Sequence, residues 1–153
     1  MLRWANPDQD AAALGQVFFD AVRTGPSPYT QAQREAWMPH VPEPCKFADK
    51  LRAQRVAVAQ EQGDAVGFMT LTPDGYIDLA YVLPTHRGRG LFVKLYDKLE
   101  AEALLLGIQR LYTHASLMAQ PAFHKVGFLI IQHETVERAG ECLARAEMEK
   151  HLK

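Results

Sequence analysis

Two glycines flanked by arginines lie in the stretch THRGRGLF, residues 85–92, between a strand-like run and a helix-like run. Glycine lets the backbone approach a ligand closely because it has no Cβ, and it adopts positive φ at little cost. Amides exposed in such a turn, together with the positive end of the following helix, form a site for a phosphate. The sequence therefore predicts an anion site at Gly88 and Gly90, to which Arg87 and Arg89 would add positive charge. The alternative is a tight turn that uses glycine only for its geometry.

Two familiar phosphate-binding loops do not fit this stretch. The dinucleotide-binding fingerprint needs a third glycine where Val93 stands. The ATPase loop needs a Gly-Lys pair followed by Ser or Thr, which the stretch lacks. A different phosphate-bearing ligand is therefore expected.

The elements that must position this loop follow from hydrophobic periodicity and from glycine and proline signals. A segment rich in proline, residues 25–46, separates the first helix from the first strand and contains one short helical piece. The pattern predicts a helix over 6–25, strands over 54–62, 65–72 and 76–84, a helix over 91–106, a strand over 108–116, a short helix within 117–128 and a closing hairpin over 128–152.

These elements predict an α/β fold with a mixed, mostly antiparallel central sheet flanked by helices. The chain has 153 residues, of which 48% are hydrophobic, so it is long enough for one compact core and too short for two large ones. We expect a single domain that covers residues 1–153. The exposed edge of the closing strand offers a surface for a homodimer.

Composition excludes several classes of partner. The formal net charge is −1 and the basic residues are scattered, so neither nucleic acid nor an anionic membrane is an expected partner. No apolar run approaches the roughly 20 residues of a membrane span, and the N-terminus lacks the apolar stretch of a signal peptide, so we expect a cytoplasmic location. Cys45 and Cys142 form no CxxC pair and the histidines show no metal spacing, so no metal site is predicted.

At the glycine loop the chain resembles the GNAT superfamily of acyl-CoA N-acyltransferases. The signature of that family, [QR]xxGx[GA], lies between its fourth strand and third helix, and here Gly88 and Gly90 match it. Thr85 departs from the usual Gln or Arg. Phe92 stands where a small residue is frequent, and it either narrows the loop or turns into the core.

Two further segments carry the resemblance. The run YVLP, residues 81–84, is similar to the strand of the family whose splayed backbone pairs with the pantetheine arm of coenzyme A. The run SLMAQPAFHKVGF, residues 116–128, is similar to the family pattern NxxAxxxYxxxGF, with Ala119 among the matches. Ser116 replaces the asparagine and Phe123 replaces the tyrosine. The chain is most similar to a small bacterial group of YafP-like proteins.

The resemblance implies direct transfer of an acetyl group from acetyl-CoA to an amine of a small molecule or peptide, with an oxyanion donor on the main chain near Val82. The departures at Thr85, Ser116 and Phe123 leave open an alternative, a CoA-binding regulatory or interaction module that has lost turnover. The residues implied to bind the cofactor are Tyr81, Val82, Leu83, Arg87, Gly88, Arg89, Gly90, Leu91, Phe92, Ser116, Ala119 and Phe123.

Acetyl transfer needs a neutral amine. A lysine-like amine has a reference pKa near 10.4, so presenting it neutral at pH 7 costs roughly 4 to 5 kcal/mol unless a base or a desolvated pocket removes the proton. Asp78 is the only acid in the strand over 76–84 and is the candidate base; a structural aspartate, with a chain of waters as the base, is the alternative.

The leaving thiolate needs a proton donor because Phe123 stands in place of the tyrosine. Ser116 is the candidate acid, with Tyr112 and His124 as alternatives. A helical neighbour of position 123 is turned about 100° away, so His124 is expected at the surface or at the edge of the cofactor. Tyr29 and Trp37, in the segment rich in proline, are the expected binding residues for the acceptor.

Overall fold

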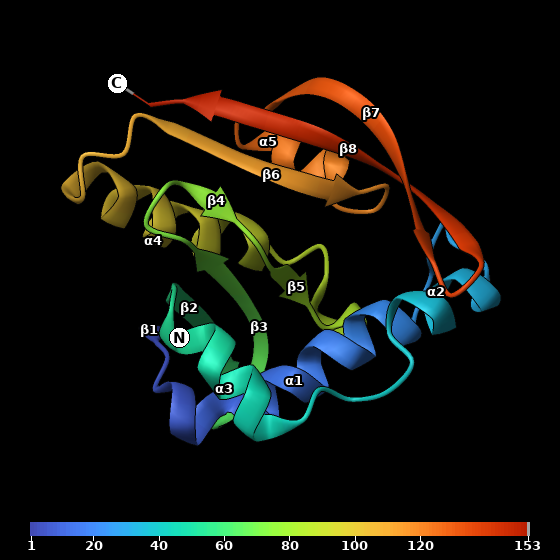
Figure 1. Cartoon of the computed structure of the whole chain (residues 1–153). Helices are drawn as coiled ribbons and strands as arrows, with labels where there is room; N and C mark the ends of the chain where they lie inside the picture. The colour runs from blue at the N-terminus through green and yellow to red at the C-terminus, as the bar shows by residue number, and fades with distance from the viewer. Residues whose placement is uncertain (153) are drawn as a thin grey trace.

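The computed structural model describes residues 1–152, which form two sheets joined by a chain segment that passes from one to the other (Figure 1). One sheet is antiparallel throughout, and the other is antiparallel except for the parallel pair β4–β6. The predicted fold class, a mixed and mostly antiparallel α/β fold, is confirmed. The first sheet has the order β1 (Leu2–Trp4), β2 (Arg55–Glu61), β3 (Asp64–Leu71), β5 (Ala80–Val82), and the second β4 (Tyr76–Ile77), β6 (Arg110–Ser116), β8 (Glu141–His151), β7 (Leu129–Arg138).

Within residues 1–152, five α-helices cover the sheets. α1 and α3 pack against the first sheet in one buried cluster, while α4 and α5 pack in a second cluster that contains residues of both sheets (Figure 1). α2 lies beside the hairpin of β7 and β8. The helices are α1 (Pro7–Arg23), α2 (Gln31–Trp37), α3 (Pro44–Arg52), α4 (Leu91–Leu105) and α5 (Gln120–Lys125), with a short 3-10 turn at Pro84–His86.

The first helix forms where the sequence predicts it. Asn6 is its N-cap and its side chain accepts from Gln9 N at 3.3 Å, and proline follows at the first helical position. At the other end the buried Arg34 of α2 donates to Val22 O at 2.6 Å and Thr24 O at 2.5 Å, so two terminal carbonyls are satisfied. These bonds fix α2, and the segment around it, against α1.

The predicted strand over 76–84 is wrong as one continuous strand. It is divided into β4, which pairs with β6 of the second sheet, and β5, which pairs with β3 of the first. Two buried threonine hydroxyls bond to the backbone at the division: Thr70 Oγ1 accepts from Leu79 N at 3.0 Å, and Thr113 Oγ1 donates to Ile77 O at 2.8 Å. Because side chains satisfy backbone groups that a regular ladder would pair, the chain passes between sheets without burying unpaired groups.

Two elements are absent from the sequence-based prediction. β1 has only three residues, too few for a periodic signal, and forms because β2 offers it a partner edge. α3 lies partly inside the segment expected to be irregular. Pro44 occupies its first turn, and Phe47, Ala48 and Leu51 bury one face against α1, so its pattern is detectable but short.

The second sheet has two chemically different faces. Along β6 the buried residues Leu111, Thr113 and Ala115 alternate with partly exposed ones, and the buried face joins the core beneath α4 and α5. The other face presents polar side chains from β4, β6, β7 and β8. Among residues 1–152, no helix is both long and apolar enough to cross a membrane.

Candidate active site

The two sheets separate at β5. Beyond Ile77 the chain stays paired to β3 but leaves β6, so a crevice opens between β5 and β6. Thr70 N donates to Leu79 O at 2.8 Å and Leu83 N donates to Val66 O at 2.9 Å, so the backbone polar groups of Leu79 and Leu83 face β3. Backbone groups alternate along a strand, and the amides of Ala80 and Val82 therefore face the crevice.

A cavity of about 360 Å³ occupies this crevice and continues to the glycine loop; we call it the loop cavity. Its walls come from β5, the start of α4, the segment after β6, and the ends of α1 and α2. Its lining includes Ala21, Val22, Ser27, Tyr29, Trp37, Ala80, Tyr81, Val82, His86, Arg87, Gly88, Gly90, Leu91, Phe92, Val93, Ser116, Met118, Ala119, Pro121, Ala122 and Lys125.

The glycine loop presents free main-chain groups to this cavity. Gly88 has φ 78° and Gly90 has φ 79°, both in the left-handed region, and no atom lies within 4 Å of the place where a Cβ would stand on either. Gly90 is the N-cap of α4, which has no side-chain cap. Within the described chain, no amide from Gly88 to Val93 donates to a main-chain carbonyl. These amides and the N-terminus of α4 can hold an anion.

Three basic side chains line the loop cavity beside these amides. Arg87 is anchored by a bond from Nη2 to Ala21 O at 2.9 Å; burial, and then the charge of Arg34, lowers the pKa of its guanidinium. His86 lies 3.4 Å from Glu61, and Lys125 comes from the last turn of α5. Arg87 and Lys125 thus bring positive charge to the walls of the cavity that contains these amides.

The substituted aromatic residues of the family pattern lie together. Phe92 packs against the core edge-to-face with Phe123, with ring centroids 5.0 Å apart, so it turns toward the core while one side lines the cavity. Phe123 is 1% exposed and contacts Phe128 on its other side. A hydroxyl at position 123 would thus lie in an apolar core.

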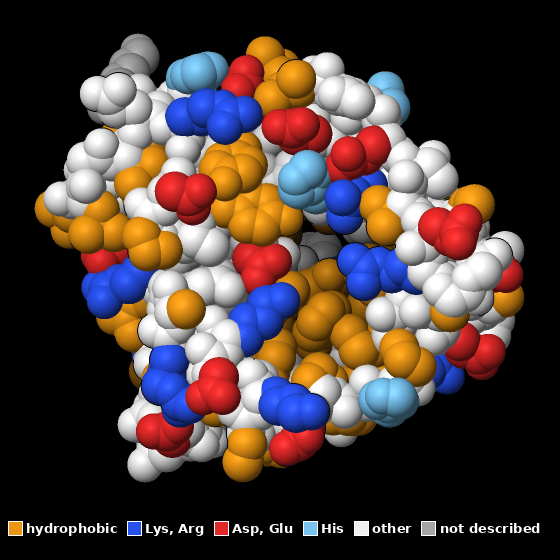
Figure 2. Space-filling model, viewed as in Figure 1, with side chains coloured by type: hydrophobic (Ala, Val, Ile, Leu, Met, Phe, Trp, Pro, Cys, Tyr) orange, Lys and Arg blue, Asp and Glu red, His pale blue; other side chains and the backbone are white. Residues whose placement is uncertain are grey.

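A second cavity, of about 350 Å³, lies on the polar face of the second sheet; we call it the sheet cavity. Figure 2 shows this face hollowed, with hydrophobic side chains inside the hollow and charged side chains around it. Aromatic rings from α1, α2 and the strand segments form much of its wall. Its lining is Phe18, Tyr29, Trp37, Met38, Lys50, Tyr76, Asp78, Leu79, Tyr81, His114, Ser116, Val136, Arg138, Leu143 and Arg145.

Asp78 lies in the sheet cavity, directly after the division of the strand. Its Oδ2 accepts from Gln54 Nε2 at 3.0 Å and lies 3.3 Å from Lys50 Nζ. Its Oδ1 has no protein partner in the part of the chain that the structure describes. Burial, and then the charge of Asp78, raises the pKa of Tyr76 to about 12. Tyr76 is therefore a neutral phenol beside a carboxylate with one free oxygen.

His114 is a second group in this cavity that can take a proton. Its Nδ1 lies 2.6 Å from Glu134 Oε1, which also accepts from Arg145 Nε at 2.8 Å. Burial opposes ionisation of Glu134, but the bonds from His114 and Arg145 outweigh it and hold the pKa of Glu134 below its usual range. The carboxylate fixes the His114 ring and leaves Nε2 for the cavity.

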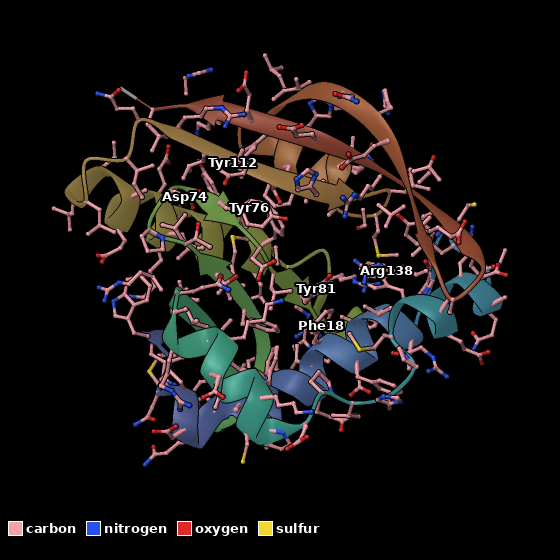
Figure 3. All side chains as sticks on the ribbon, viewed as in Figure 1. Phe18, Asp74, Tyr76, Tyr81, Tyr112 and Arg138 are labelled. Atoms are coloured by element: carbon pink, nitrogen blue, oxygen red, sulfur yellow. The ribbon has the colours of Figure 1, made fainter. Side chains whose placement is uncertain are left out.

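Four residues line both cavities and mark where they meet: Tyr29, Trp37, Tyr81 and Ser116. The Tyr29 hydroxyl donates to Ala144 O at 2.5 Å and accepts from Leu117 N at 2.9 Å, so it holds α2 to the second sheet. Ser116 Oγ accepts from Ala119 N at 3.2 Å and keeps its own proton available. Tyr81 stacks on Phe18, with centroids 4.5 Å apart, and burial is the main cause that raises its pKa (Figure 3).

The structure brings most of the predicted site residues together. Three of them line neither cavity: Leu83, Arg89 and Phe123. The Leu83 amide bonds to β3, Arg89 is exposed and lies 3.7 Å from Glu61, and Phe123 is buried. Their assignment to the cofactor stays a prediction. Neither alternative acid lines a cavity. Tyr112 donates to Asp74 at 2.8 Å (Figure 3), and His124 is exposed on the surface.

Sequence reasoning missed several residues of the site. Lys125 lies inside the run that carries the resemblance, two residues before its glycine, and that position was a usable signal. His114, Arg138 and Arg145 carry no local signal, because strand pairing alone brings β6, β7 and β8 to one face. Among residues 1–152, no group of three or more His, Cys, Asp or Glu side chains could hold a metal ion.

The chain belongs to the GNAT family of acetyltransferases. The family model described as an acetyltransferase (GNAT) domain matches residues 26–152, so the family resemblance read from the glycine loop is confirmed. The chain is 30% identical over 132 residues to the uncharacterized N-acetyltransferase YafP of Escherichia coli (strain K12), covering 86% of this chain and 83% of that protein.

Two solved structures have the same fold. The GCN5-related N-acetyltransferase of Rhodopseudomonas palustris superposes with a TM-score of 0.90 at 35% identity, covering 99% of this chain and 95% of that one. The putative acetyltransferase yncA of Salmonella typhimurium, solved with its cofactor acetyl-CoA, has a TM-score of 0.76 at 19% identity over 100% and 94% of the two chains. The second likeness supports the fold alone.

Proposed function

We propose that this acetyltransferase binds acetyl-CoA in the loop cavity and transfers its acetyl group directly to an amine held in the sheet cavity. The observation that carries the proposal is the meeting of the two cavities at Tyr81 and Ser116, where the strands part. One cavity offers free amides for a diphosphate, and the other offers carboxylate and imidazole groups for an amine. A direct transfer needs both ligands to meet at one point.

The loop cavity suits coenzyme A in its chemistry. The amides from Gly88 to Val93 and the cations Arg87 and Lys125 would hold the diphosphate, because several charge-assisted bonds converge there. The amides of Ala80 and Val82 on the open edge of β5 would pair with the amide groups of the pantetheine arm. The absence of a Cβ at Gly88 and Gly90 leaves room for the phosphates.

Residues of the sheet cavity would prepare the amine. When bound, acetyl-CoA supplies a thioester whose C–S bond breaks as the amine nitrogen forms the new C–N bond, and the thiolate leaves with the bonding pair and takes up a proton. Asp78, through its free Oδ1, would accept the proton of the amine. His114 Nε2 is the second candidate for this step. The Val82 amide would donate to the developing oxyanion.

The departing thiolate would take its proton from a hydroxyl where the cavities meet. Ser116 is suitable because its oxygen already accepts from Ala119 N and its proton remains free. Tyr81 is a second donor there, and its raised pKa keeps it protonated. Neither depends on position 123, so the loss of the family tyrosine does not by itself remove the proton source.

Two measurements test the proposal. Isothermal titration with acetyl-CoA should show saturable binding, and a thiol-release assay over a panel of amines should show turnover with at least one. Binding without turnover on any amine supports the alternative, a regulatory CoA-binding module. Absence of binding overturns the assignment of the loop cavity.

We further propose that residues 1–153 form one domain, that the protein is cytoplasmic, and that the closing strand mediates a homodimer. The acceptor would be an amine of a small molecule or of a peptide. Size-exclusion chromatography with light scattering would test the dimer: a mass of one chain at micromolar concentration would contradict it.

A further inference from the structure

The charges in the sheet cavity are not balanced. Its lining contains three cations, Lys50, Arg138 and Arg145, and one carboxylate, Asp78. Lys50 is paired with Asp78 at 3.3 Å. Arg145 Nε donates a hydrogen bond to Glu134 Oε1, but the terminal nitrogens of Arg145 have no hydrogen-bond partner within residues 1–152. The side chain of Arg138 forms neither an ion pair nor a hydrogen bond with any described residue.

Arg138, which has no ion pair, and Arg145, whose terminal nitrogens are free, lie on one side of the cavity. Arg138, on β7, and Arg145, on β8, extend from the same face of the second sheet. Arg145 lies opposite Glu134 in the β7–β8 register, and Arg138 follows Glu134 by four residues on β7, so the side chains share one face. Figure 3 shows Arg138 beside Tyr81 and Phe18, with Tyr76 on the other side of Tyr81. The charge of Arg138 favours ionisation of Tyr81, though far less than burial opposes it, which agrees with a cation close to the ring.

The walls around these cations are aromatic. Phe18 and Trp37 each contact Tyr81 there, with ring centroids 4.5 Å apart for Phe18 and Tyr81 and 6.3 Å apart for Trp37 and Tyr81. Arg138 is itself exposed, but an ion pair formed against this apolar wall is less screened than one surrounded by water. The planar fork of arginine also matches a carboxylate or phosphonate bidentately.

We infer that the acceptor is an amine that also carries an anionic group, which Arg138 and the terminal nitrogens of Arg145 bind while its amine points toward Asp78 and the meeting point of the cavities. The inference rests on the proposed function and names the class of acceptor. A zwitterion of the α-amino acid type complements this arrangement, because the lining offers a carboxylate for its amino group and arginines for its anionic group. A simple monoamine leaves Arg138 and the terminal nitrogens of Arg145 without a partner.

The first test compares matched acceptors in the thiol-release assay. Phenylalanine and its phosphonate analogue carry an anionic group, whereas phenylalaninamide and phenethylamine present the same ring and amine without one. We expect kcat/KM to be at least about tenfold higher for an anionic member, mostly through a lower KM, because the arginines bind its anionic group. A tenfold difference corresponds to about 1.4 kcal/mol. Preference for the carboxylate or for the phosphonate identifies the kind of anion. Equal or better turnover of the neutral members overturns the inference while leaving the acetyltransferase assignment intact.

Variants then locate the anion site. Arg138→Gln should raise KM for the anionic acceptors about tenfold and change that for the amide less than twofold. Arg138→Lys should recover part of the loss, because charge returns without the fork. Arg52→Gln is the matched control, since Arg52 is an exposed arginine paired with Asp8 and Asp49 and lines neither cavity. Equal losses for both classes of acceptor contradict an anion site at Arg138.

A binding measurement separates this site from catalysis. The N-acetyl amino acid keeps the carboxylate but has lost the reactive amine, so it can be titrated into the protein in the presence of CoA. Affinity should fall with Arg138→Gln and stay unchanged with Arg52→Gln. If the protein shows thiol release with other amines yet binds N-acetylphenylalanine no better than its amide, the anion site is disproved; absence of thiol release with every amine instead counts against the proposed function.

Discussion

The loop cavity and the sheet cavity differ in what they are made of. The loop cavity depends on main-chain amides, two glycines and small or apolar side chains drawn largely from two continuous stretches, residues 80–93 and 116–125. The sheet cavity depends on long polar and aromatic side chains from α1, α2, α3 and the strands β4 to β8. Under the proposed function, the cofactor shared by the family would be held by backbone geometry, whereas the acceptor would be held by side chains that can vary independently.

The largest effect is expected in the sheet cavity, at the proposed base. Asp78→Asn keeps the shape of the side chain but cannot accept the amine proton, so kcat should fall about 100-fold or more at neutral pH, while the Kd for acetyl-CoA stays within about twofold. Steady-state kinetics with titration of the cofactor checks this. If His114→Gln causes the larger loss in kcat and Asp78→Asn little, the base is His114.

A smaller effect is expected in the loop cavity, where the affinity for acetyl-CoA changes rather than kcat. Gly90→Val forces a β-branched residue into left-handed backbone and places a side chain in the open space beside the amides, so Kd for acetyl-CoA should rise about 10- to 100-fold. Gly63→Val is the control, because Gly63 has φ 84° and open space but lies in the β2–β3 turn. Similar losses of affinity in both variants would mean that strain alone, and not the loop, weakens binding.

Restoring the family tyrosine should reduce stability and should not increase turnover. Phe123→Tyr places a hydroxyl in a site that is 1% exposed and lined by Phe92 and Phe128, at a cost of about 1 to 3 kcal/mol if it finds no partner. The melting temperature should therefore fall by roughly 2 to 4 °C per kcal/mol, as measured by calorimetry. A rise in kcat would show instead that position 123 can reach the thiolate.

The smallest effect concerns an ion pair far from both cavities. Arg3 donates to both oxygens of Asp10 at 2.8 Å, and this pairing is the main reason that the pKa of Asp10 is lowered below 3.8. A lowered folded-state pKa contributes stability that is present above the unfolded pKa and is lost as pH falls through the folded value. Asp10→Asn should cost about 1 kcal/mol at pH 7 in urea unfolding, with the difference closing below pH 4.

Neither cavity should respond to this last change. The Kd for acetyl-CoA and the KM of any acceptor should match the wild type at pH 7, because Asp10 lines neither cavity. A shift in either constant would mean that the start of α1 is coupled to the site. Binding would then depend on a region outside the two cavities.

The sequence predicted the elements that have strong periodicity or clear ends. α1 begins after Asn6, α4 ends before Gly107, and the closing hairpin turns at Ala139 and Gly140, each as expected from local chemistry. Apart from α3, whose local pattern is short, the features it missed depend on partners: β1 needs the edge of β2, and the division of strand 76–84 needs hydroxyls from Thr70 and Thr113. No local pattern carries that information.

By itself the sequence determined the glycine loop and predicted an anion there, because left-handed backbone and free amides at a strand-to-helix junction are properties of adjacent residues. It also indicated Asp78 and Ser116, which lie next to recognisable segments. Only the tertiary structure decided what lies opposite them: His114 oriented by Glu134, and on one face Arg138 and the free terminal nitrogens of Arg145, whose Nε bonds to Glu134. Those positions follow from pairing between strands distant in sequence, and side chains meet across a sheet only after its register is set.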